Sequence, residues 1–123
     1  MKGLNVVLLQ SDPRNVRAIA DSLEGTFHSV YAARSLDELR TSIARNRATV
    51  AIVDMEMASI SDVERLSREF PGMCIVCTHR LADEQMWTAA LSAGAVDICP
   101  SQDTRAILAT ALRNVTVART AAA

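Results

Sequence analysis

The sequence lacks the features that mark several large classes of protein. Its only lysine is Lys2, and thirteen basic side chains are balanced by fourteen acidic ones, for a net charge of −1. Without a basic run or patch, nucleic-acid binding by this domain is not expected. The apolar stretches are far shorter than the roughly 20 residues that a membrane-spanning helix needs. No secretory leader follows Met1, so we expect a cytoplasmic protein with no membrane partner.

The three cysteines also offer no clear redox or metal site. Cys74 and Cys77 form a Cys-x-x-Cys, but they lie in the strand-like segment 73–77. Residues three apart in a strand point to opposite faces of the sheet. No second cysteine pair exists to complete a tetrahedral zinc site. We therefore interpret the cysteines as small buried apolar side chains.

What the sequence does contain is a regular alternation of apolar runs and helical patterns. Its 123 residues suffice for one domain with a hydrophobic core. The alternation predicts an α/β fold, a three-layer doubly wound (βα)5 arrangement around a parallel sheet. We expect the domain to span residues 1–118 and to leave 119–123 as a C-terminal tail. The strands are predicted at residues 4–9, 27–32, 50–53, 73–77 and 95–99.

Capping signals locate the helices between these strands. Asp12-Pro13 predicts the start of the first helix, and Gly25 predicts its end. Capping boxes at residues 35–38 and 61–64 predict the starts of the second and third helices. Apolar periodicity indicates the fourth and fifth helices, over residues 86–93 and 107–115.

Asp54 is the leading candidate for a site residue. It directly follows the apolar run 50–53, which places its carboxylate at the carboxyl end of a buried strand. Ligands bind open α/β sheets at this edge. The turn after the first strand, Gln10-Ser11-Asp12, contains no glycine, which argues against a nucleotide-binding loop.

The informative segments are residues 7–13, 53–57, 75–78 and 90–97. In their order and spacing they resemble the receiver domain of bacterial response regulators, the chemotaxis-type domain of two-component phosphorelay signalling. The resemblance covers essentially the whole chain and implies the flavodoxin-like sheet order 2-1-3-4-5. It places Asp54 at the phosphoacceptor position and Thr78 at that of a hydroxyl that hydrogen-bonds the phosphoryl group. It also places Glu56 where a backbone carbonyl is a metal ligand.

The same resemblance identifies what this sequence has replaced. Gln10 and Ser11 stand where the family has two acids that bind Mg²⁺, and Ser101 stands where it has a lysine. Mg²⁺ is usually held by carboxylates, and a transferring phosphoryl group needs its charge compensated. Ile98 replaces a common aromatic switch residue. These replacements predict a degenerate pseudo-receiver with no cofactor, in which Mg²⁺ matters only if the Asp54 site is functional.

Other residues near this edge have both an ordinary and a functional interpretation. Asp12 and Glu56 are possible accessory ligands, with Asp54, of a displaced cation site, although Asp12 also has a role as a helix cap. His79 is a lone loop histidine, and such residues are more often solvated than ligands.

Trp87 and Met86 are the candidate protein-interface residues. Trp87 is the only tryptophan, and the resemblance puts it on the face that family members use to bind partners or to dimerise. A partly exposed tryptophan beside a methionine is a frequent interface anchor. The alternative is that Trp87 packs over Leu91 and only covers the end of the helix.

Three functions remain open. The leading one is a signalling module that works by phosphorylation-independent protein–protein interaction with a histidine kinase, an output domain or a second copy. The second is an atypical phosphoacceptor at Asp54 that takes phosphate from a histidine kinase. The third is a small-ligand sensor in a pocket of Gln10, Ser11, Thr78 and Ser101. We do not expect an enzyme, because these positions supply no nucleophile–base pair.

Overall fold

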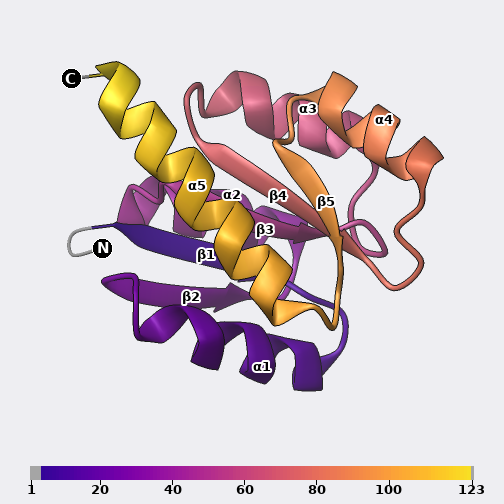
Figure 1. Ribbon diagram of the computed structural model, residues 1–123, viewed down its shortest axis with the longest axis horizontal. Helices are drawn as coiled ribbons and strands as arrows, with labels where there is room; N and C mark the ends of the chain where they lie inside the picture. The colour runs from indigo at the N-terminus through magenta and orange to yellow at the C-terminus, as the bar shows by residue number, and fades with distance from the viewer. Residues whose placement is uncertain (1–3, 123) are drawn as a thin grey trace.

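The computed structural model describes the backbone of residues 4–122 and the side chains of residues 4–115. One parallel sheet has the strand order β2-β1-β3-β4-β5, which confirms the predicted flavodoxin-like fold (Figure 1). The strands are β1 (Asn5–Leu9), β2 (Ser29–Ala33), β3 (Val50–Asp54), β4 (Cys74–His79) and β5 (Asp97–Pro100). The helices are α1 (Pro13–Glu24), α2 (Leu36–Asn46), α3 (Ile60–Glu69), α4 (Glu84–Ala93) and α5 (Thr104–Ala122).

The sheet separates two hydrophobic cores. Side chains alternate along a strand, so Val6 and Leu8 of β1 contribute to one core while Val7 and Leu9 contribute to the other. The first core is covered by α1 and α5, and the second by α2, α3 and α4. Figure 1 shows α5 crossing the near face of the sheet, with α2 behind it. Burial on both faces explains why the central strands are continuously apolar.

The cysteines are distributed as the strand period predicts. Cys77 belongs to the core under α2, α3 and α4, whereas Cys74 and Cys99 belong to the core under α1 and α5. All three thiols are free and buried. Burial raises the pKa of Cys74 to about 11 and that of Cys77 to about 12. These thiols are therefore uncharged core side chains at neutral pH.

The raised thiol pKa values predict a loss of stability in alkali. The unfolded chain releases these protons near its ordinary thiol pKa of 9.0, before the folded chain does. The stabilisation is therefore complete below about pH 9 and is lost progressively as the pH rises from there towards the folded values of about 11 and 12. We expect the free energy of unfolding to fall by about 2–3 kcal/mol between about pH 8 and pH 10. Urea unfolding measures this, and Cys77→Ala should remove about half of the dependence; an unchanged slope in that variant would contradict the assignment.

Helix starts agree with the capping signals, with one exception. Asp12 caps α1 and Ser35 caps α2, as predicted. The box predicted at residues 61–64 is wrong, because α3 begins two residues earlier. There Ser59 Oγ accepts from Asp62 N at 3.1 Å, and Asp62 Oδ2 accepts from Ser59 N at 2.8 Å. The earlier start brings Ile60 into contact with the core. The predicted helix, whose apolar pattern began at residue 63, did not include this contact.

Gly94 allows α3 and α4 to pack closely. It ends α4 with a φ of 111°, a left-handed conformation that favours glycine. A Cβ atom at this position would clash with the Ser67 side chain of α3. The predicted end of the fourth helix is thus confirmed, with a steric reason in addition to the conformational one.

The C-terminal helix is longer than its apolar pattern indicated. Helix α5 continues to Ala122, so the expected division at residue 118 falls inside a helix. Ala123 and the side chains after residue 115 lie outside the described part of the chain. Within that part, no helix is both long enough and apolar enough to cross a bilayer.

Candidate functional site

Four polar side chains predicted to form the site meet at the carboxyl edge of the sheet. They follow or end four different strands, and parallel strands bring such positions to one edge. Asp54 and Thr78 are direct register partners in β3 and β4. All four are nearly inaccessible, with exposures of 6% for Gln10, 1% for Asp54, 0% for Thr78 and 1% for Ser101. The predicted positions therefore share one edge of the sheet, and the structure places these side chains beneath the surface.

Both carboxylate oxygens of Asp54 already accept hydrogen bonds. Oδ2 accepts from the backbone N–H of Ser11 at 2.8 Å and from its hydroxyl at 2.7 Å. Oδ1 accepts from the backbone N–H of Glu56 at 2.8 Å. Hydrogen bonds to an ionised acceptor are among the stronger ones in proteins. The turn after β1 is thereby tied to the turn after β3, with Ser11 covering the carboxylate.

Gln10 connects two strands that are not neighbours. Its Nε2 donates to Thr78 Oγ1 at 2.9 Å in a buried contact between residues 68 positions apart. Because β3 lies between β1 and β4, this bond spans the end of the strand that carries Asp54. Gln10 Oε1 and Ser101 Oγ are buried and make no hydrogen bond within the described residues. The Thr78 hydroxyl is thus engaged by an internal amide.

The residues at this edge do not fit a magnesium ion. Mg²⁺ requires near-octahedral oxygen ligands and usually takes one or two carboxylates. Asp54 supplies the only carboxylate among the four buried side chains, and its oxygens face Ser11 and Glu56. The amide nitrogen of Gln10 faces Thr78. Among residues 4–115, no group of three or more His, Cys, Asp or Glu residues is arranged to hold a metal ion.

The two accessory acids form ion pairs of their own. Asp12 caps α1 and also pairs with Arg14, whose hydrogen bond lowers the pKa of the Asp12 carboxyl. Glu56 Oε1 accepts from Arg80 Nε at 2.7 Å. A displaced cation site formed by Asp12, Asp54 and Glu56 is therefore not found: each carboxylate has a different partner.

Arg80 is the residue near the site that the sequence analysis missed. It lies just beyond β4 and lines a shallow cavity of about 370 Å³ together with Ser11, Asp12 and Glu56. Its Nε donates to Glu56 Oε1, so its charge is paired with a carboxylate that lines the same cavity. The sequence indicated its location through its position two residues after Thr78, close to the carboxyl end of a predicted strand.

Trp87 and Met86 point to different surroundings. Trp87 is 47% exposed, and its indole Nε1 donates to Asp97 Oδ1 at 3.1 Å, which fixes the ring beside the start of β5. Met86 is partly buried against the core under α2, α3 and α4. Of these two residues, Trp87 is therefore the one that presents a large apolar surface.

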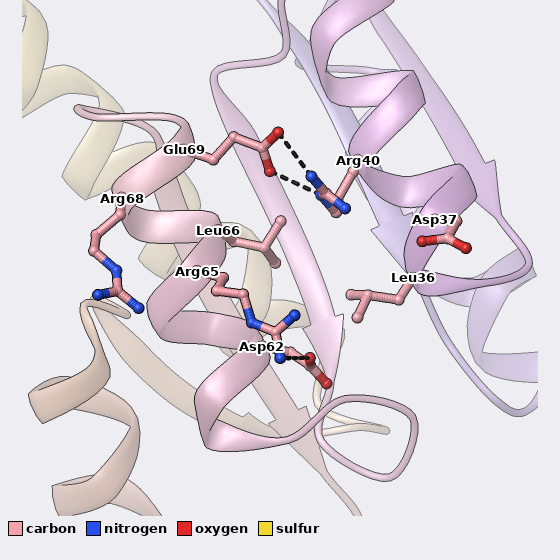
Figure 2. A pocket seen from close by; sticks show the side chains of 8 residues that line it. All are labelled: Leu36, Asp37, Arg40, Asp62, Arg65, Leu66, Arg68 and Glu69. Atoms are coloured by element: carbon pink, nitrogen blue, oxygen red, sulfur yellow. Dashed lines mark hydrogen bonds and ion pairs between the residues drawn. The ribbon is translucent and has the colours of Figure 1, made fainter.

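Another hollow, of about 470 Å³, lies between α2 and α3 (Figure 2). Arg40 of α2 reaches across it to the Glu69 carboxylate of α3 with contacts of 2.8 and 3.0 Å. Asp62 and Arg65 also pair on its rim, at 3.7 Å. Because these charges compensate one another, we interpret the hollow as a gap between two helices that an ion pair spans, and not as a binding site.

Comparison with known proteins gives a clear result only at the level of the fold. Neither a protein-family model nor a curated protein matches the sequence. Solved structures do match. The RcsB response regulator of Salmonella typhimurium superposes with a TM-score of 0.81 at 22% identity, over 94% of this chain and 61% of that chain. This chain thus spans less than two thirds of that protein.

Two further structures match along nearly their whole length. A response regulator from Thermotoga maritima has a TM-score of 0.83 at 20% identity, over 92% of this chain and 98% of its own. A CheY-like receiver domain protein from Methanospirillum hungatei has a TM-score of 0.83 at 16% identity, over 95% and 97%. The chain therefore has the fold of the receiver domains of two-component response regulators.

Proposed function

We propose that this chain is a receiver-type signalling module, not an enzyme, that acts through protein–protein contact without phosphate turnover at Asp54. The observation that carries the proposal is the internal hydrogen bonding of the site. Ser11 and Glu56 occupy both oxygens of Asp54, and Gln10 occupies the hydroxyl of Thr78. Groups that would contact a metal ion and a phosphoryl group in a working receiver are held by the protein itself.

The contact surface we propose is centred on Trp87. A tryptophan that is about half exposed and held in one orientation loses little freedom when a partner covers it, and such residues dominate interface energetics. The bond from its indole N–H to Asp97 supplies that orientation. The candidate partners are a histidine kinase, an output domain and a second copy of the chain. Binding to a second copy can be tested with the purified protein.

Trp87→Ala is expected to weaken self-association about 10- to 100-fold, the usual effect of losing a central aromatic anchor. Sedimentation equilibrium over a range of protein concentrations measures it. Tyr31→Ala is the matched control, because Tyr31 is a similarly exposed aromatic (37%) on β2, at the opposite edge of the sheet. Equal effects of the two variants would contradict an interface at Trp87. A wild-type chain that stays monomeric would eliminate the second copy as the partner.

The second candidate function is a working phosphoacceptor at Asp54, and one observation favours it. Arg80 lines a cavity with Ser11, Asp12 and Glu56, where it is paired with Glu56, and arginine recognises phosphate well. Covalent labelling by acetyl phosphate that requires Mg²⁺ and is lost in both Asp54→Asn and Arg80→Ala would favour this candidate over the first. A ligand pocket formed by Gln10, Ser11, Thr78 and Ser101 has less support. Gln10, Thr78 and Ser101 are buried, and the Ser11 hydroxyl donates to Asp54.

A further inference from the structure

An apolar groove separates the loop after β3 from α4, close to the Asp54 edge but distinct from it. This α3–α4 groove has a volume of about 340 Å³, within the range of small-molecule sites. Met55, which follows Asp54, and His79, which follows Thr78, both line it. Ile98 of β5 also contributes to the lining.

Small and adaptable side chains shape the groove. Ala58 and Ala89 face it from its two sides, and their short side chains leave space between the loop and the helix. Met55 and Met86, both partly buried against the core, also line it. Methionine adjusts its shape readily and makes favourable contacts with aromatic rings. These walls suit the apolar body of a ligand, whose burial would supply the main driving force.

His79 provides one directional polar group. The backbone N–H of Leu81 donates to His79 Nδ1 at 2.9 Å. In the neutral ring the proton must then reside on Nε2, which becomes a hydrogen-bond donor. No partner for Nε2 occurs among the described contacts of His79. A carbonyl-type acceptor on a ligand would satisfy it.

The lining of the groove selects against ions. It contains no Asp, Glu, Lys or Arg. A charged group of either sign would therefore lose its hydration in the groove without gaining a charged partner, which is costly. We propose that the α3–α4 groove binds a small uncharged ligand that has an apolar body and one carbonyl-type acceptor for His79. This proposal is independent of phosphate chemistry at Asp54.

Three matched probes test the proposal on the full chain by amide and methyl chemical shifts. Acetophenone has the apolar ring and the acceptor, ethylbenzene lacks the acceptor, and benzoate carries a negative charge. We expect acetophenone to give saturable shifts centred on Met55, His79 and Ile98. Ethylbenzene should bind about fivefold more weakly, since it cannot accept the hydrogen bond. Benzoate should bind more weakly than acetophenone because its carboxylate would be desolvated without a charged partner.

Two variants separate binding in the groove from weak association elsewhere. Ala89→Leu fills the groove from the helix side at a partly exposed position and should abolish the shifts. His79→Phe keeps a ring and should reduce the affinity for acetophenone to that for ethylbenzene. Thermal unfolding and the spectrum without probe establish that both variants are folded. No saturable shift in the wild type, unchanged binding in Ala89→Leu, or tighter binding of benzoate would each overturn the proposal.

Discussion

Asp54→Ala is expected to lower the free energy of unfolding by about 2–4 kcal/mol. The carboxylate accepts from Ser11 N, Ser11 Oγ and Glu56 N, so three donors lose an acceptor at once. Hydrogen bonds to a charged group contribute about 1.5–3 kcal/mol each, and the desolvation cost that the variant recovers reduces their sum. Ser11 is exposed, so water can partly solvate its freed groups. Urea unfolding at neutral pH measures the change.

The sign of this effect distinguishes two roles for Asp54. A carboxylate kept for chemistry is often strained or poorly satisfied, and removing it then stabilises the protein. A carboxylate that serves to hold two turns together stabilises the fold instead. Asp54→Asn retains an acceptor for Glu56 N and should lose less than Asp54→Ala. Ser11→Ala combined with Asp54→Ala in a double-mutant cycle isolates the side-chain bond. A neutral or stabilising Asp54→Ala would contradict the proposed function.

The fold was predictable because burial and chain period act locally. Continuous apolar runs identified the strands between covering helices, and Asp12 and Gly94 marked helix ends through their capping chemistry. Phe27 shows the limit of this reasoning. It is buried like a strand residue, but its N–H bonds to Leu23 O and closes α1, so β2 begins only at Ser29. A buried residue in a loop and one in a strand look alike in an apolar pattern.

The candidate site was predictable in its position but not in its connections. Residues at the ends of parallel strands must meet at one edge, so Asp54 and Thr78 could be placed together from the sequence. The bond from Gln10 to Thr78 joins positions 68 residues apart and depends on the side-chain conformation of an amide. The pair between Glu56 and Arg80 depends likewise on where two loops turn. Sequence patterns identify such residues as polar and near an edge, but they do not identify their partners.

Restoring the replaced residues should strengthen the response to a phosphoryl mimic. We consider a variant that combines Gln10→Asp, Ser11→Asp and Ser101→Lys. It adds two carboxylates, whose oxygens Mg²⁺ requires, and a positive charge that can compensate a phosphoryl group. The Gln10–Thr78 bond and the Ser11 hydroxyl bond to Asp54 are removed by the same changes. We expect affinity for the phosphoryl mimic beryllofluoride, in millimolar Mg²⁺, to increase on the order of a hundredfold, as two charge-assisted contacts would give. Amide shifts and Trp87 fluorescence report it.

The thermal stability of the restored variant, measured without a phosphoryl mimic, provides the control for this experiment. Three neighbouring carboxylates repel one another, so the metal-free variant should unfold at a lower temperature than the wild type, and Mg²⁺ should reverse that loss. Adding Asp54→Asn should abolish the beryllofluoride response. Ser101→Lys alone should give none, because it leaves Gln10 and Ser11 in place. A wild-type chain that already responds as strongly as the restored variant would show that Arg80 or another group compensates for the missing residues, and the phosphoacceptor function would then replace our leading proposal.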